Sequence, residues 1–268
     1  MAKLAVTTGY SKNGLPYVRL GSGQRKLVIF GGGPDFDHRP PSGLMLRMWT
    51  SMFKRLAEDF TVYYVSRKPN LPAGYSTRNM SDDYATMIRD ELEGPVDIMG
   101  LSSGGPIAQH FAVDHPDLVH RLVLAETGYA LSKKGKELTR RLGDLARQGK
   151  WRTAAADLAT VLYPRGVKKL LFKSLMWLLG KRVFGAPTDL SDGLVEVEAE
   201  ANHDFKERLA EIKVPSLVIG GEEDYFYPIR ETAEGIPNAK LILYEGLGHD
   251  AIMKRQFNED VLAFLTEK

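Results

Sequence analysis

The stretch from Pro95 to Ala108 places a serine on a sharp turn between a strand and a helix. An apolar run ends in Gly100-Leu101-Ser102-Ser103-Gly104, and an apolar helical pattern follows at once. Such a turn needs neighbours without Cβ atoms, because the backbones of the strand and the helix crowd against it. The pattern therefore predicts that the Ser102 hydroxyl projects from the edge of a sheet, where a substrate and a base can reach it.

Strand patterns alternate with helix patterns on both sides of this turn. Such alternation predicts an α/β fold, with a mostly parallel central sheet and helices on both of its faces. Ser81 is the expected N-cap of the helix that precedes the turn. The expected strands are residues 4–8, 16–20, 26–30, 61–65, 96–99, 122–125, 216–220 and 240–244, and the expected early helices are 42–60, 81–92 and 103–114.

The interval from about residue 131 to residue 204 has helical patterns but no convincing strand. We therefore predict an all-helical insertion after the sixth strand. The expected domains are a core of residues 1–129 and 206–268, and an inserted helical cap of residues 130–205.

Composition excludes several classes of protein. The chain of 268 residues is 43% hydrophobic, carries a net charge of +2 and contains no cysteine. Disulfides, thiolate metal sites and a cysteine nucleophile are therefore excluded, and the overall charge gives no case for nucleic acid as a partner. The first residues lack the apolar core of a signal peptide, and no apolar run approaches the ~20 residues that span a bilayer. A cytoplasmic protein is the expectation.

A serine nucleophile needs a base, and His249 has the best position for that role. It follows residues 240–244, a predicted strand, and in parallel sheets ligand sites gather beyond the carboxyl ends of the strands. A role in the loop or as a cap is the alternative. The other histidines are His38, His110, His115, His120 and His203, which lie in an early loop, on the next helix, at the opposite edge or in the insertion.

The base needs an acid that holds its tautomer and stabilises the imidazolium. Glu222, Glu223 and Asp224 all follow the predicted strand 216–220. Spacing alone does not decide which of these three carboxylates is the acid. A solvated acidic turn with no catalytic role is the alternative.

These motifs together resemble the α/β-hydrolase family over nearly all of the chain outside the insertion. The order Ser102, Asp224, His249 is the family order of nucleophile, acid and base. Gly221-Glu222-Glu223-Asp224 with Pro228 is similar to the family's acid loop, which favours Asp224. Gly246-Leu247-Gly248-His249 resembles its histidine loop. The resemblance implies neither a metal nor a cofactor.

The loop Gly31-Gly32-Gly33-Pro34 stands where the family places its oxyanion loop, with Gly31 at a position that is commonly histidine. The resemblance assigns the oxyanion donors to the backbone N–H groups of Gly33 and Ser103. Only the amide of Ser103 is then needed, so its hydroxyl should be replaceable. A dinucleotide-binding loop is disfavoured, because Phe36 occupies the third glycine position and Pro34 intrudes.

The loop after strand 61–65 departs from the family. It contains Ser66-Arg67-Lys68-Pro69 where many relatives have Asp-x-Arg-Gly. Since this loop usually orients neighbouring structure, we expect the change to affect the subfamily more than the mechanism.

The expected activity is hydrolysis of a small or medium carboxylic ester through an acyl-enzyme, with a small-molecule acyl substrate as the partner. Amidase or aminopeptidase action, C–C bond hydrolysis, acyl transfer and perhydrolysis use the same residues. A non-catalytic ligand receptor on the same scaffold is the alternative from another class. Serine at position 102 argues against dehalogenase and epoxide-hydrolase chemistry, which need a carboxylate nucleophile.

The insertion is strongly basic between residues 131 and 182, with 14 lysines and arginines against three acids, a net charge of +11. Acidic residues from Asp189 to Asp204 could neutralise it within the cap. Alternatively, residues 167–179, which are basic, apolar and contain Trp177, could line an acyl pocket or touch anionic lipid. The sequence does not predict the oligomeric state.

Overall fold

The computed structural model describes residues 4–33, 38–162, 166–183 and 189–267, with the side chains of 162–169 and 182–183 outside the description. Eight strands form one sheet in the order β1-β2-β4-β3-β5-β6-β7-β8. The strands are β1 (Val6–Tyr10), β2 (Pro16–Leu20), β3 (Arg25–Phe30), β4 (Phe60–Val65), β5 (Val96–Leu101), β6 (Val119–Ala125), β7 (Ser216–Gly221) and β8 (Lys240–Tyr244).

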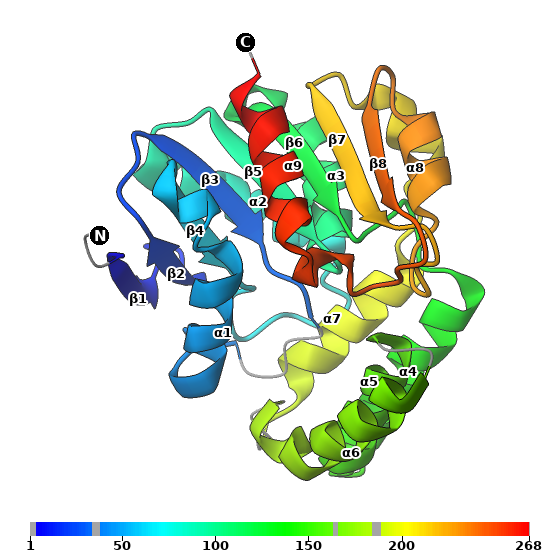
Figure 1. Ribbon diagram of the computed structural model, residues 1–268. Coiled ribbons are helices and arrows are strands. Elements are labelled where there is room, and N and C mark those ends of the chain that lie inside the picture. Colours follow the sequence, from blue (N-terminus) through cyan, green and yellow to red (C-terminus); the bar gives the residue numbers. More distant parts are fainter. Residues whose placement is uncertain (1–3, 34–37, 163–165, 184–188, 268) are drawn as a thin grey trace.

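The sheet is mostly parallel, as the sequence predicts. Only the hairpin β1–β2 and the pair β2–β4 are antiparallel. The six strands β3 to β8 run in one direction (Figure 1). All these carboxyl ends therefore lie at one edge, where loops from distant parts of the sequence meet.

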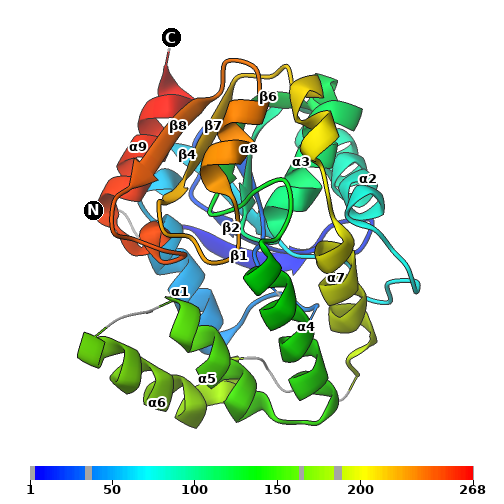
Figure 2. The same cartoon turned by 90° about the vertical axis from the view of Figure 1, so that its right-hand side faces the viewer.

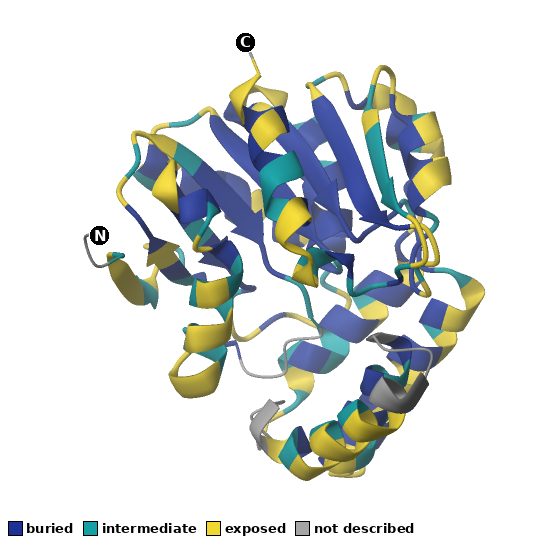
Figure 3. Ribbon diagram, viewed as in Figure 1, coloured by how far each residue is buried: buried dark blue, intermediate teal, exposed yellow. Residues whose placement is uncertain are grey.

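Helices cover both faces of the sheet, with α1 and α9 on one face and α2, α3 and α8 on the other (Figures 1 and 2). Side chains alternate along each strand, so Leu27 and Ile29 pack in one apolar cluster while Val28 and Phe30 pack in the other. The central strands are thus buried on both faces (Figure 3). The helices are α1 (Gly43–Phe53), α2 (Thr77–Met87), α3 (Gly104–Asp114), α4 (Lys133–Arg147), α5 (Trp151–Leu162), α6 (Gly166–Val183), α7 (Ser191–Asn202), α8 (Ile229–Gly235) and α9 (Arg255–Thr266).

The prediction of Ser81 as a helix N-cap is wrong. Helix α2 begins at Thr77, and its N-cap is Ser76, whose hydroxyl accepts from the Asn79 amide while the Asn79 side chain accepts from the Ser76 amide. This reciprocal pair satisfies two of the free donors at the helix start. Ser81 lies within the helix and is fully buried.

Helices α4 to α7 lie between β6 and β7 in the sequence, and they group together on the side where the parallel strands end (Figure 1). The division into domains at residues 130 and 205 stays a prediction. Across the described ranges, which omit 1–3 and the three internal gaps, no helix is long and apolar enough to cross a membrane.

Candidate active site

Ser102 occupies the turn between β5 and α3 in a strained backbone conformation, with φ of +50°. Its amide donates to Ala125 O at 2.9 Å, and its carbonyl accepts from the Gly105 amide at 2.9 Å. A Cβ on Gly104 would lie 2.1 Å from Phe30 O, so glycine is required there. A side chain rarely adopts this φ without support from its surroundings, and such strain is common at functional sites.

The structure brings together the three residues that the sequence selects as nucleophile, base and acid. Ser102 Oγ and His249 Nε2 are 2.9 Å apart, and His249 Nδ1 is 2.8 Å from Asp224 Oδ2. With a neutral imidazole, the Ser102 hydroxyl donates to Nε2 while Nδ1–H donates to Asp224. This is the arrangement in which a histidine can remove the proton of an attacking serine.

Asp224, and not its acidic neighbours, faces the imidazole. Its other oxygen, Oδ1, accepts from the amides of Phe226 and Tyr227 at 2.7 and 2.9 Å, so the loop after β7 fixes the carboxylate. Glu222 instead accepts from Arg230 at the surface, at 3.1 Å. The amide of Glu223 donates to Leu247 O at 2.8 Å and so ties the acid loop to the histidine loop.

The environment of His249 makes it a stronger base than a free imidazole. Burial lowers the pKa of His249, but the adjacent carboxylates, Asp224 foremost, outweigh burial and raise that pKa to about 9. The ring of Phe226 packs against the imidazole edge to face, with centroids 4.8 Å apart. The base is therefore held by a charge on one side and by an aromatic ring on another.

A second carboxyl group, which the sequence analysis did not select, lies beside the same imidazole. Glu126 follows β6 with φ of +53°, and its Oε2 is 3.5 Å from His249 Nδ1. Its Oε1 accepts from the Ile252 amide at 3.2 Å, whereas Oε2 is buried without a hydrogen-bond partner among the described residues. Burial raises the pKa of Glu126 to about 8. Its position at the carboxyl end of a strand is a signal that could have identified it.

Glu126, Asp224 and His249 also form a group whose ligand atoms all lie within 4.8 Å of one another. Two carboxylates and an imidazole could hold a divalent cation. The Nδ1 atom that would bind it, however, already shares a hydrogen bond with Asp224. The group therefore fits an acid-supported base better than a metal centre.

The expected oxyanion donors, Gly33 and Ser103, are adjacent but bonded to each other. The Gly33 amide donates to Ser103 Oγ at 2.7 Å, so it is not directed at the space beside Ser102. Arg67 also donates to Ser103 Oγ, from Nη2 at 2.9 Å, and Nη1 donates to Gly31 O. These contacts argue against the expectation that the Ser103 hydroxyl is replaceable, because this buried hydroxyl joins three loops. Residues 34–37, including Pro34 and Phe36, lie outside the described residues.

Helix α7 contributes two buried carboxyl groups to the same region. Glu196 pairs with the fully buried Arg67, with Oε1 2.5 Å from Nε. Glu200 accepts from the hydroxyl of Tyr227, which lies beside the Ser102 side chain. Burial raises the pKa of Glu200 to about 7. The last turns of the inserted helices therefore contact the nucleophile's own hydrogen-bond network, which no local pattern in the sequence indicates.

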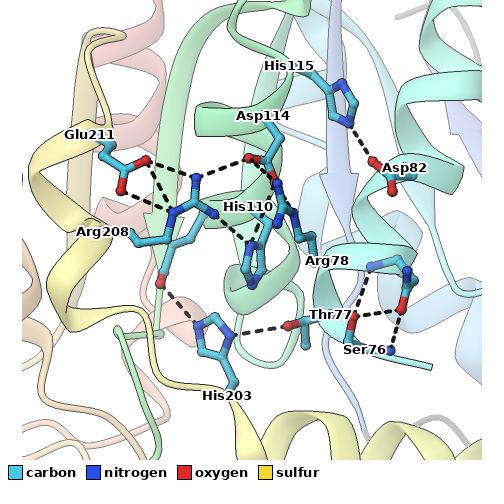
Figure 4. Close-up of polar contacts among 12 residues, drawn as sticks. Ser76, Thr77, Arg78, Asp82, His110, Asp114, His115, His203, Arg208 and Glu211 are labelled. Atoms are coloured by element: carbon cyan, nitrogen blue, oxygen red, sulfur yellow. Dashed lines mark hydrogen bonds and ion pairs between the residues drawn. The ribbon is translucent and has the colours of Figure 1, made fainter. Parts of the chain in front are cut away.

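His110, His115 and His203 have partners outside the triad (Figure 4). His203, after α7, contacts Thr77 at 3.2 Å, and His115 contacts Asp82 at 2.9 Å. Burial lowers the pKa of His110 to about 4 and that of His203 to about 3, so both are neutral. His203 connects the end of α7 with Thr77 on α2 and Gln109 on α3. Neither histidine contacts the triad, so we assign them no part in proton transfer. His120 contacts Asp97 at 2.8 Å, and His38 contacts the Lys68 carbonyl at 2.9 Å and lies 3.5 Å from Glu196 on α7.

The parallel sheet, the strained serine turn and the acid and histidine loops define one class of protein, and the chain belongs to it. Residues 27–256 match the family model of the alpha/beta hydrolase fold. This confirms the family that the sequence motifs resemble.

Particular relatives span nearly the whole chain at low identity. A pimeloyl-acyl-carrier-protein methyl ester esterase of Nitrosomonas europaea is 24% identical over 82% of this chain and 90% of its own length. A 2-hydroxy-6-oxo-6-phenylhexa-2,4-dienoate hydrolase of Comamonas testosteroni is 23% identical, over 94% of this chain and 91% of its own. The enol-lactonase of Burkholderia xenovorans has a similar fold, with a TM-score of 0.74 at 21% identity, covering 97% of this chain and 100% of that one.

Proposed function

We propose that the protein is a serine hydrolase that cleaves a small or medium carboxylic ester through an acyl-enzyme intermediate. The observation that carries this proposal is the pair of hydrogen bonds from Ser102 to His249 and from His249 to Asp224, at 2.9 and 2.8 Å. The relatives named as an esterase and a lactonase support ester chemistry. The relative named as a dienoate hydrolase keeps C–C bond hydrolysis as an alternative on the same residues.

Acylation begins when Ser102 Oγ attacks the ester carbonyl while His249 Nε2 takes its proton. The imidazolium that forms is stabilised by Asp224, which remains ionised. The Ser103 amide, at the N-terminus of α3, is the first donor that we assign to the oxyanion. The Gly33 amide becomes the second donor only when the substrate oxygen replaces Ser103 Oγ as its acceptor. Nε2–H then protonates the leaving alcohol as the C–O bond breaks.

Deacylation repeats these steps with water as the nucleophile. His249 removes a proton from water, the hydroxide attacks the acyl carbon, and Ser102 Oγ leaves with the proton from Nε2. The carboxylic acid product departs and the triad returns to its starting state. Helix α7, whose Glu200 meets Tyr227 beside the nucleophile, belongs to the wall that selects the substrate in this proposal.

The test is Ser102→Ala, assayed with chromogenic esters and with a fluorescent active-site phosphonate. We expect loss of labelling and a decrease in kcat of about 10⁵-fold or more, because among the described residues no other hydroxyl is paired with His249. Ser51→Ala, an exposed serine on α1, is the control and should retain both signals. Undiminished ester turnover in Ser102→Ala would overturn the mechanism, and absence of labelling in the natural protein would favour the receptor alternative.

A further inference from the structure

Helix α6 exposes an apolar stripe. At about 100° per residue these side chains fall within a sector of about 160°, so they form one face of the helix. The exposed fractions are 68% for Leu170, 66% for Leu171, 49% for Leu175, 47% for Trp177 and 64% for Leu178.

Rotation of α6 cannot bury the stripe, because the opposite face of the helix packs against α5. Met176 packs partly buried against the core cluster, and Gly180 is buried. A Cβ on Gly180 would lie 2.7 Å from Arg152 Cα, so the backbones of the two helices are in direct contact there. The guanidinium of Arg152 lies over the ring of Trp177, 4.8 Å from its centroid. Both faces of α6 are therefore apolar, and the described residues of the chain cover only one of them.

The stripe lies in strongly basic surroundings. By sequence, α6 contains five lysines and arginines and no acid, within the interval 131–182 of net charge +11. Three of the six acids between Asp189 and Asp204 bind the core and so do not pair with the basic residues of this interval. Asp192 accepts from the amides of Asn70 and Leu71 at 2.8 and 2.6 Å, Glu196 pairs with Arg67, and Glu200 with Tyr227.

We propose that the outer face of α6 is a peripheral membrane-binding surface that takes up anionic phospholipid. An exposed apolar face flanked by basic residues is the composition of a helix that lies in the plane of a bilayer interface. The leucines and Trp177 enter the boundary between headgroups and acyl chains, and basic residues such as Lys173 and Lys181, both exposed, contact the phosphates. A second copy of the chain is the less favourable occupant, because it would bring two basic surfaces together.

Co-sedimentation with phosphatidylcholine vesicles, with and without phosphatidylglycerol, tests the proposal. We expect the natural protein to pellet with the anionic vesicles only, to be released by high salt, and to show a blue shift of Trp177 emission that Trp177→Phe removes. Leu171→Asp/Leu178→Asp should abolish pelleting. Both side chains are exposed, so the fold should be retained, as circular dichroism will show.

Two sets of variants separate the apolar and electrostatic contributions. Lys173→Glu/Lys181→Glu should weaken binding to anionic vesicles by about tenfold or more, since each basic residue near such a surface contributes appreciably. Tyr10→Asp, a half-exposed aromatic on β1 at the far edge of the sheet (Figure 1), is the control and should bind normally.

Three results would overturn the proposal: no preference for anionic vesicles, unchanged binding of Leu171→Asp/Leu178→Asp, or a dimer in sedimentation equilibrium that this double variant dissociates without any vesicle binding. Binding is measured without turnover, so these outcomes do not depend on the proposed hydrolase activity.

Discussion

Two carboxyl groups approach one imidazole nitrogen. Asp224 Oδ2 lies at hydrogen-bond distance from His249 Nδ1, at 2.8 Å, while Glu126 Oε2 lies at 3.5 Å. Only the nearer oxygen can accept the Nδ1 proton, but a charge on the farther one still stabilises the imidazolium. At the scale of single residues, His249 thus has Asp224 as its principal acid and Glu126 as a second carboxyl group nearby.

Removing the principal acid should reveal the second one. We expect Asp224→Ala to lower kcat/KM by about 10²-fold, less than the ~10⁴-fold typical of a triad that loses its acid, because Glu126 ionises more readily without a charged neighbour. Asp224→Ala/Glu126→Gln should lose at least about tenfold more. If the double variant matches Asp224→Ala in steady-state kinetics, Glu126 has no such role.

The pH profile of Glu126→Gln gives an independent readout. His249 acts as a base only when neutral, so kcat/KM should rise with pH towards the His249 pKa of about 9. The Glu126 carboxylate helps to raise that pKa, and its loss should move the midpoint to lower pH. A purely structural role would lower activity without moving the midpoint.

At the scale of elements, one buried hydroxyl joins the loop after β3 and the loop after β4 to the start of α3. Ser103 Oγ accepts from Gly33 and from Arg67, and Arg67 continues to Glu196 on α7. The inserted helices are therefore connected to the oxyanion loop through a single guanidinium.

Two buried serines make this joint testable. Ser103→Ala should lower the free energy of unfolding by about 1–3 kcal/mol, because it removes the acceptor of the buried Arg67 guanidinium and of the Gly33 amide. Ser81→Ala is the matched control, since the Ser81 hydroxyl is fully buried with no hydrogen-bond partner among the described residues. That change should be neutral or slightly stabilising. Equal losses for both variants in urea unfolding would contradict the role of Ser103 as a joint.

Those features that depend on local pattern could be predicted from the sequence. Strands β2 and β8 have the predicted bounds, because continuous or alternating apolar runs between turn residues mark strands. Ser102 and His249 are predicted from residue types at the carboxyl ends of strands, whereas Asp224 is selected among three carboxylates by the resemblance to the family. The contacts of Arg67 with Ser103 and Glu196 could not be predicted, and neither could the contact of Glu126 with His249. These residues are distant in the sequence and meet only through tertiary packing.

At the scale of the whole molecule, charge is unevenly distributed. Residues 131–182 carry +11 while the chain as a whole carries +2, so the remaining residues carry −9. The structure keeps these charges apart, because α4, α5 and α6 lie together at one end (Figure 2). The molecule therefore has a large dipole although its net charge is small.

This asymmetry predicts retention on a cation exchanger at a pH just above the isoelectric point. A chain with evenly mixed charges would pass through such a column, whereas the basic end of this one should bind until salt is raised. Lys173→Glu/Lys181→Glu should elute earlier. Elution in the flow-through would show that internal pairing neutralises the basic helices.

The chain leaves the sheet at Ala125 and returns at Ser216, and these positions belong to hydrogen-bonded neighbouring strands. The sheet therefore already holds both ends of the long excursion together. Lengthening the excursion adds little closure entropy, which grows only with the logarithm of loop length. The distances within the triad are set by the loops that follow β5, β7 and β8, so we expect α4, α5 and α6 to be free to diverge while the chemistry stays fixed. Helix α7 is not free in this way, because its Glu196 and Glu200 bind Arg67 and Tyr227 beside the reaction centre. New specificities should therefore arise most readily in the first three inserted helices.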